Sequence, residues 1–209
     1  MHTLQPGQWL GDEVIHAFLK ILLAHHNVRQ SRHGDGLRQC LYYKSFFLTS
    51  LLQMGHRKHQ GLYDFNQVRR WSRRAPDGNL FSLDKLIIPI NEGRVHWVCI
   101  VVSFRQCTIE FFDSMGANGT QRLEAVHRYL RDEWSSTRAA ATFPTFELIP
   151  NRPSTPRQGN TCDCGVYVCF FAMRQIANLP LVVSPAEITR FHGWIAHTIL
   201  TGHFPNVLA

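Results

Sequence analysis

A change in the spacing of apolar residues, near residue 80, constrains the fold more than any other feature of this sequence. Before it, apolar side chains recur at helical intervals, which predicts helices over residues 13–26, 41–54 and 64–74. After it, the period becomes that of β-strands. The predicted strands cover residues 85–90, 95–102, 107–113 and 146–149, and further helices are predicted over 121–134, over 165–172 and after a capping box at Ser184 and Glu187. This order predicts an α+β fold with a central sheet of four to five strands and helices on both sides.

The length of 209 residues and the hydrophobic content of 44% suit one compact domain, so we expect residues 1–209 to form a single unit. Aromatic residues make up 11% of the chain, which excludes a disordered protein. No apolar run approaches the ~20 residues that cross a bilayer, so we expect no membrane partner. The first residues lack the pattern of a secretory signal, and we therefore expect an intracellular protein.

The six cysteines are expected to be free thiols, because a chain of this size with its own core needs no disulfides. Their only close pair, Cys162 and Cys164, has no second pair at matching spacing, so we expect neither a metal site nor another cofactor. Lys and Arg exceed Asp and Glu by 22 − 15 = 7, which favours acidic partners. The one dense basic run, residues 69–74, is short and typical of a solvated helix face, so nucleic acid is not an expected partner.

The predicted strands over 95–102 and 107–113 are close enough in sequence to form a hairpin. If the chain turns symmetrically about Phe104 and Arg105, facing residues have numbers that sum to 209, and His96 faces Asp113. A histidine oriented by a carboxylate is the base that a thiol nucleophile requires. The turn has no Asn-Gly or Asp-Gly signal, so symmetry alone gives this register. Glu110 falls on the opposite face from Asp113 and is expected to be solvated.

Residues 158–165 place a cysteine where a polar loop becomes an apolar helix. Unpaired N–H groups and the positive end of the helix dipole stabilise a thiolate at such a position, so Cys164 is the candidate nucleophile. The alternative is that Cys164, like Cys169, is only a small buried hydrophobic residue. Cys162 lies in the loop and is the weaker candidate. Gln158, six residues before Cys164, can donate its side-chain amide to an oxyanion.

Five ordered blocks of residues cover nearly the whole chain and resemble one family. They are Trp9-Leu10 with residues 12–15, Phe46-Phe47 with Val68 and Trp71, residues 88–90 followed by His96-Trp97, residues 112–114, and Gln158, Asn160 and residues 163–165. Their order and spacing are similar to those of the SUMO-specific, or sentrin-specific, cysteine proteases. These are relatives of the adenoviral protease in the ubiquitin-like-protein protease superfamily. The sequence departs from the family's usual residues at Gly11 and Cys162.

The resemblance implies a papain-like or adenain-like cysteine protease fold with a catalytic set of four residues. Carried over to this sequence, Cys164 is the nucleophile, His96 the general base, Asp113 its orienting acceptor and Gln158 the oxyanion donor.

The resemblance also assigns two tryptophans to substrate binding. Trp9 and Trp97 match the residues that enclose the Gly-Gly tail of the substrate, where two indole faces leave no room for a Cβ. Core packing is the alternative role for both side chains.

The implied activity is that of a thiol isopeptidase and endopeptidase that cleaves after the C-terminal Gly-Gly of SUMO, freeing it from lysines and trimming its precursor. The implied partners are SUMO and SUMO-conjugated proteins. The enzyme is expected to be a monomer and to act in the nucleus and also in the cytoplasm. Another ubiquitin-like modifier is an alternative substrate, although residues 93–97 lack the glycine-rich insertion that we associate with relatives acting on other modifiers. The remaining alternatives are a non-catalytic ubiquitin-like-binding module, which would need no base or oxyanion donor, and a nucleic-acid-binding module, which explains only the charge.

Overall fold

The computed structural model describes residues 5, 7–32, 38–55, 57–138 and 141–204, and its centre is a five-stranded sheet with the order β1-β2-β3-β4-β5. The antiparallel pairs β2–β3 and β3–β4 form its middle, while β1 and β5 run parallel to their neighbours, so the sheet is mixed. The strands are β1 (Cys40–Tyr42), β2 (Lys85–Glu92), β3 (His96–Ser103), β4 (Thr108–Phe112) and β5 (Glu147–Ile149).

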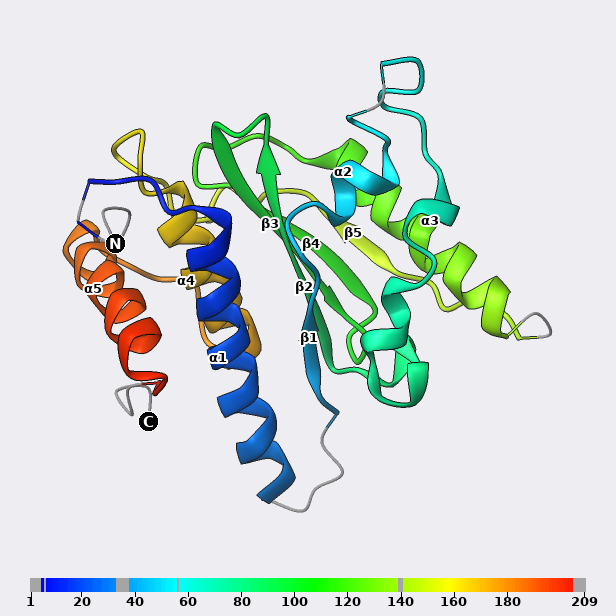
Figure 1. Cartoon of the computed structure of the whole chain (residues 1–209), viewed down its shortest axis with the longest axis horizontal. Coiled ribbons are helices and arrows are strands. Elements are labelled where there is room, and N and C mark those ends of the chain that lie inside the picture. The colour runs from blue at the N-terminus through cyan, green and yellow to red at the C-terminus, as the bar shows by residue number, and fades with distance from the viewer. Residues whose placement is uncertain (1–4, 6, 33–37, 56, 139–140, 205–209) are drawn as a thin grey trace.

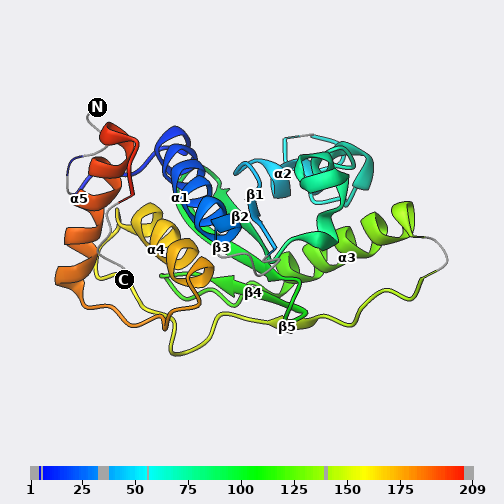
Figure 2. The ribbon, with the colours of Figure 1, turned by 90° about the horizontal axis from the view of Figure 1, so that it is seen from below.

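Helices cover both faces of the sheet, as Figures 1 and 2 show from two directions. On one face lie α1 (Asp12–Arg32), α4 (Cys164–Ile176) and α5 (Pro185–Thr201), and on the other lie α2 (Phe47–Leu51) and α3 (Thr120–Thr137). The predicted α+β architecture is therefore confirmed. Short 3-10 turns between α2 and β2 cover Phe65–Gln67, Trp71–Arg74, Pro76–Gly78 and Leu80–Ser82.

Strand β3 is apolar along its length because it contributes to two cores at once. Its odd-numbered residues from 97 to 101 belong to the apolar cluster that contains α1, α4 and α5. Its even-numbered residues from 98 to 102 belong to the cluster that contains α2 and α3. Successive side chains of a strand point to opposite faces, and here both faces are buried. The strand that begins with His96 is therefore held firmly from both sides.

Helix α4 is buried along most of its length and begins at Cys164. Eleven of its 13 residues are buried. At its far end, the ammonium of the buried Lys85 of β2 donates to the Gln175 carbonyl and to the Asn178 side chain. Burial lowers the pKa of Lys85, and a cation at this end complements the negative pole of the helix dipole. The helix is thus fixed by packing along its sides and by a buried cation at its C-terminus.

The predicted helix over residues 41–54 is wrong in its first half. Residues Cys40–Tyr42 form β1, parallel to β2, and only Phe47–Leu51 is α-helical. Tyr43 continues the extended run, because its backbone N–H donates to the Ile87 carbonyl at 2.9 Å. A short apolar run rich in aromatic residues suits a buried strand as well as a helix, and periodicity alone does not separate the two.

The predicted helix over residues 64–74 is also wrong, since this segment forms two separate 3-10 turns. The Asp64 side chain accepts from the Asn66 N–H at 3.0 Å and so closes the first turn locally. The predicted division of faces nevertheless holds: Val68 is fully buried and Trp71 is half-buried, whereas the four arginines of residues 69–74 are exposed.

The later predicted elements are confirmed with small shifts at their ends. The helix over 121–134 is α3, the strand over 146–149 is β5, and the helix over 165–172 is α4. The capping box before α5 is present, because the Ser184 Oγ accepts from the Glu187 N–H and the Glu187 carboxylate accepts from the Ser184 N–H. Within the described ranges, no helix combines the length and the apolar character needed to cross a bilayer.

Candidate active site

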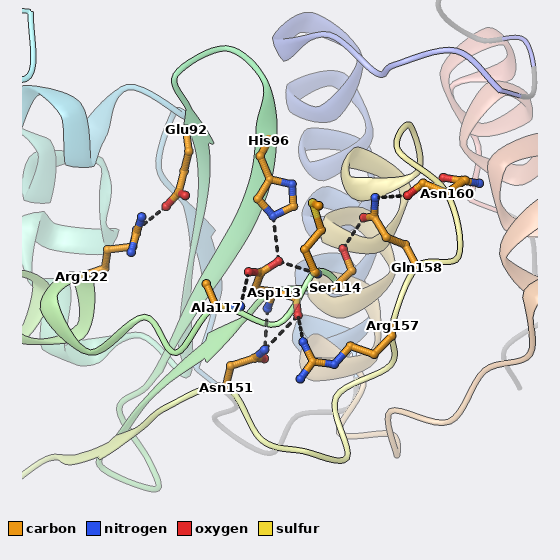
Figure 3. Close-up of polar contacts among 11 residues, drawn as sticks. Glu92, His96, Asp113, Ser114, Ala117, Arg122, Asn151, Arg157, Gln158 and Asn160 are labelled. Atoms are coloured by element: carbon orange, nitrogen blue, oxygen red, sulfur yellow. Dashed lines mark hydrogen bonds and ion pairs between the residues drawn. The ribbon is translucent and has the colours of Figure 1, made fainter.

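His96 and Asp113 meet as predicted, although the strand register differs from the predicted one. Facing residues of β3 and β4, such as Cys99 and Phe112, have numbers that sum to 211 rather than 209. The turn holds the four residues 104–107, with Cys107 in the left-handed region at φ 52°. A shift of two residues keeps every side chain on its own face. Asp113, one residue beyond β4, therefore still reaches His96, with 2.7 Å between Oδ1 and Nε2 (Figure 3).

The Asp113 carboxylate is buried, with 1% of the residue exposed, and it is surrounded by donors. The backbone N–H groups of Met115 and Ala117 donate to its two oxygens at 2.7 Å each, in addition to His96. Burial by itself would raise the pKa of Asp113, but the hydrogen bonds from His96 and from the two amides outweigh it, and the pKa lies below its usual value. Asp113 is therefore an anion at neutral pH.

The backbone of Asp113 is fixed by the loop that follows β5. The Asn151 side chain accepts from the Asp113 N–H at 3.1 Å and donates to the Asp113 carbonyl at 2.9 Å, and Arg157 donates to the same carbonyl at 3.4 Å (Figure 3). The sequence did not predict this role for Asn151, because the contact joins residues 38 positions apart and neither residue carries a local spacing signal.

His96 lies at the first position of β3 with 15% of its side chain exposed. The hydrogen bond with Asp113 raises the pKa of His96 to about 9, the Cys164 thiol adds to this rise, and burial opposes it. The imidazole is therefore protonated at neutral pH. Its other nitrogen, Nδ1, is buried and makes no hydrogen bond to the described residues, so it is available for proton exchange with a thiol or a leaving group.

Cys164 is the first residue of α4, as predicted from its place between the polar loop and the apolar helix, and it is 1% exposed. Its electrostatic contact with His96 places the thiol beside the His96–Asp113 pair. Cys162 differs: it is half-buried in the loop, and its thiol lies 3.8 Å from an Asp163 carboxylate oxygen. Burial and the Asp163 charge raise the pKa of Cys162, which disfavours its thiolate. The structure thus joins His96, Asp113 and Cys164 into one cluster.

Gln158 lies beside this cluster and is held at both ends of its amide. Its Oε1 accepts from the Ser114 Oγ at 2.6 Å, and its Nε2 donates to the Asn160 carbonyl at 2.6 Å (Figure 3). Its backbone N–H also donates to the Ser114 carbonyl at 3.1 Å. Because Ser114 directly follows Asp113, these contacts attach the Gln158 loop to the hairpin. The oxyanion role of Gln158 stays a prediction.

The two tryptophans occupy different environments. Trp97 is 3% exposed, and its indole N–H donates to the Leu10 carbonyl at 3.0 Å. A Cβ on Gly165 would lie 2.9 Å from the Leu10 Cβ and 3.5 Å from the Trp97 ring. Trp97 and the segment after Trp9 therefore pack against the residue that follows Cys164. Trp9 is 44% exposed, and the substrate role of both tryptophans stays a prediction.

Glu110 corrects one expectation about this sheet. Its side chain was expected in solvent, but only 17% of it is exposed, and one carboxylate oxygen accepts from the Arg152 Nε at 2.8 Å. The reason is that the loop after β5 lays Arg152 against this face of β4. Elsewhere, within the ranges that the structure describes, no three His, Cys, Asp or Glu side chains cluster in a way that could hold a metal ion.

Comparison with protein families gives this geometry a context. Residues 8–198 match the family described as "Ulp1 protease family, C-terminal catalytic domain". The chain belongs to this family of cysteine proteases. The resemblance that the five sequence blocks indicated is therefore confirmed.

Curated relatives support the same assignment at moderate identity. Ubiquitin-like-specific protease 1 of Saccharomyces cerevisiae is 30% identical over 204 residues, which are 95% of this chain and 28% of that protein. Human sentrin-specific protease 2 is 28% identical over 203 residues, which are 96% of this chain and 31% of that protein. The chain therefore spans less than a third of the length of these two relatives.

Solved structures share the fold. A structure of the SUMO protease Ulp1 with its catalytic cysteine oxidised to a sulfonic acid aligns with a TM-score of 0.74 and 28% identity, covering 97% of this chain and 83% of that one. The Ulp1 protease domain in complex with Smt3, the yeast ortholog of SUMO, aligns with a TM-score of 0.72 and 28% identity, covering 95% and 80%. The predicted fold class is thus matched by protease domains of known structure.

Proposed function

We propose that this protein is a thiol isopeptidase and endopeptidase that cleaves after the C-terminal Gly-Gly of SUMO. One observation carries the proposal: His96 lies between the Asp113 carboxylate, 2.7 Å away, and the Cys164 thiol at the start of α4. A nucleophile, a base and an orienting acceptor in this order are the parts of a cysteine protease. A module that only binds its partner would have no use for this arrangement.

In the first half of the proposed reaction, Cys164 as a thiolate attacks the carbonyl carbon of the substrate's last glycine. A carbon–sulfur bond forms, and the carbonyl electron pair moves to oxygen. The Gln158 amide and the backbone N–H groups at the start of α4 are the donors for this oxyanion, and each such donor contributes roughly 10²–10³ in rate. The carbon–nitrogen bond then breaks, and the lysine amine leaves with the proton of His96.

The second half of the reaction releases the modifier. His96, now neutral, takes a proton from water while the water oxygen attacks the thioester carbonyl carbon. The carbon–sulfur bond breaks, which returns the thiolate of Cys164 beside protonated His96 and leaves a carboxylic acid on the modifier. This acid loses its proton to solvent and becomes a carboxylate. Asp113 keeps the imidazole oriented through both halves and stabilises its charged form.

A groove next to the site suits the body of a protein modifier. It has a volume of about 1210 Å³ and runs between α2 and the β2–β3 turn that precedes His96. Its walls include Phe46 and Met54, which are 53% and 45% exposed, together with Glu92 and Arg94. Large exposed apolar side chains with a polar rim are typical of protein-binding surfaces. We assign the folded part of the modifier to this groove.

SUMO is the favoured modifier for two reasons. Several relatives are named as SUMO or sentrin-specific proteases, and one was solved with the yeast ortholog of SUMO. The segment Gly93–Trp97 is also short and contains no inserted loop. We further propose a nuclear location, with a cytoplasmic fraction, and a monomeric enzyme.

The deciding experiment is covalent capture with modifiers that carry an electrophile at the C-terminal glycine. SUMO, ubiquitin and other ubiquitin-like proteins are offered separately at equal concentration, and adduct formation is followed by mass spectrometry. We expect rapid labelling by SUMO at Cys164. Labelling by another modifier alone would replace SUMO, and labelling by none would remove the proposed activity.

A further inference from the structure

We propose that the far end of the sheet carries a second binding site, which takes a peptide segment through a side-chain carboxylate. The site is a pocket of about 310 Å³ formed by the β3–β4 turn, the end of α3 and the segment before β5. Two arginines, Arg38 and Arg138, line the pocket together with four aromatic residues. The aromatic residues are Phe81, Phe104, Trp134 and Phe146.

Arg138 is prepared for an acceptor that the described chain does not supply. Its guanidinium lies 4.6 Å from the Trp134 ring centroid and 5.3 Å from that of Phe81, so two aromatic rings hold it in place. Its Nη2 donates to the Asn79 Oδ1 at 2.7 Å. Its Nη1 is buried and has no hydrogen-bond partner among the residues that the structure describes. A buried donor left unpaired is costly, and an anionic acceptor would remove that cost.

Charge complementarity fixes the sign of the ligand. Among the described residues, none that lines the pocket is acidic, and neither Arg38 nor Arg138 forms an ion pair. Two positive charges beside aromatic side chains favour a ligand that has both a negative charge and an apolar part. A guanidinium pairs with a planar carboxylate through two parallel hydrogen bonds, and the short stem of Glu or Asp can cover the aromatic side chains. A pocket of this size holds one or two side chains, which points to an acidic peptide segment.

This site is independent of the catalytic cluster. His96 begins β3 and Ser103 ends it, so the β3–β4 turn lies about 23 Å from His96 along the strand. Figure 1 shows this turn at the opposite end of the sheet from the β2–β3 turn. Changes at the pocket are therefore expected to leave the cleavage chemistry intact.

The test measures binding of a fluorescein-labelled Glu-Glu-Leu-Glu-Glu peptide to the full chain by fluorescence anisotropy, with Gln-Gln-Leu-Gln-Gln as the neutral control. We expect the acidic peptide to bind and the neutral peptide not to bind. Arg138→Gln should weaken binding about tenfold to a hundredfold, because hydrogen bonds to a charged group are lost. Arg38→Gln, at an exposed position, should weaken it severalfold and keeps the test valid if Arg138→Gln lowers the melting temperature.

Arg70→Gln is the matched control, since it removes one exposed positive charge that does not line the pocket. Equal weakening by Arg70→Gln would mean that the net charge alone attracts the peptide, and it would overturn the proposal. Equal binding of the neutral peptide would also overturn it, in favour of a purely apolar pocket. Displacement of the peptide by inorganic phosphate at concentrations well below those of acetate would reassign the pocket to phosphate groups.

Discussion

The three proposed catalytic side chains come from two regions that are held in place by different forces. Cys164 starts a helix with eleven of its 13 residues buried, and apolar packing positions it. Asp113 directly follows β4, and hydrogen bonds with backbone amides and with Asn151 position it. His96 begins β3, and its hydrogen bond with Asp113 orients its imidazole. We call these the packed region and the bonded region.

The difference predicts how each region responds to substitution. Packing is non-directional, so a change in the packed region that leaves a void acts first on the free energy of unfolding. Hydrogen bonds are directional, and those of the bonded region converge on a few polar atoms of Asp113. A change there should act first on turnover while the fold persists. The predictions below test this division, from the largest expected effect to the smallest.

The largest effect is expected for Cys164→Ser, which should abolish cleavage of SUMO conjugates while SUMO binding is largely kept. The hydroxyl fills nearly the same space but is a far poorer nucleophile than a thiolate. Turnover of a SUMO conjugate and SUMO affinity by calorimetry measure the two properties. Cys162→Ser is the control and should retain activity. Loss of activity in Cys162→Ser together with turnover in Cys164→Ser would move the nucleophile to the loop.

Asp113→Asn should lower kcat by up to about 10⁴-fold, somewhat less than removal of His96, because an amide still holds the ring but stabilises its positive charge poorly. The melting temperature should also fall, because the substitution removes the charge that stabilises protonated His96 in the folded protein. If the bonded region acts mainly on chemistry, the loss of kcat should far exceed what this destabilisation explains. Steady-state kinetics and thermal unfolding of the same preparation check both points. Full activity in Asp113→Ala would show that the observed contact with His96 has no catalytic role.

Trp97→Ala should lower the free energy of unfolding by about 3–5 kcal/mol, as expected for a large core side chain. If the ring also encloses the Gly-Gly tail, the cleavage rate should fall further than unfolding explains, even at a temperature where the variant is folded. Chemical denaturation and low-temperature kinetics separate the two contributions. A destabilised variant that cleaves at the parental rate when folded would leave Trp97 with a packing role only.

Asn151→Ala should lower kcat about tenfold, because it removes both side-chain hydrogen bonds to the Asp113 backbone, each worth roughly 1 kcal/mol. Asn151→Asp should keep the bond that accepts from the Asp113 N–H and lose the one that donates to its carbonyl, so its kcat should lie between those of the parent and Asn151→Ala. The readout is kcat together with the pH profile described next. An unchanged kcat in Asn151→Ala would show that the loop is not needed to place the carboxylate.

The smallest effect is a displacement of the alkaline limb of the pH profile. The pKa of His96 is raised to about 9 in the folded protein, above the value of about 6.5 for a free histidine. The stabilising interaction with Asp113 is therefore fully present below about pH 6.5, and it is lost as the pH rises through about 9. We expect kcat/KM to fall above pH 9 in the parent and at lower pH in Asp113→Asn. If kcat/KM fell at the same alkaline pH in the parent and in Asp113→Asn, the interaction with Asp113 would not be the cause of the raised His96 pKa.

The bonded region could be predicted from the sequence only in part. His96 and Asp113 were paired correctly although the register was wrong, because a shift of two residues preserves the face of each side chain. Asn151 could not be predicted, since its partner lies 38 residues away and a loop determines the approach. Local spacing carries information about strands but little about how a long loop returns to them.

The packed region was predicted more completely. The change from polar loop to apolar run located the start of α4 at Cys164, because a buried helix needs a continuous apolar sequence. The same reasoning was wrong for residues 41–54, where β1 and a short helix share one apolar run. There, parallel pairing with β2 decided the outcome, and such a contact between distant segments leaves no trace in local periodicity.

The hydrogen bonds of Lys85 also affect the opposite end of helix α4, where Cys164 lies. Its ammonium is bound by Gln175 and Asn178 in a place where water does not reach it. If α4 slid along its axis or unwound its last turn, this charge would lose its acceptors while still buried, at a cost of several kcal/mol. Through Lys85, the sheet thus fixes the position of α4 along the helix axis. The helix has 13 residues and is about 20 Å long, and it is held at its C-terminal end. Lys85 therefore helps to fix the position of the Cys164 sulfur relative to the His96 imidazole, although it contacts neither group.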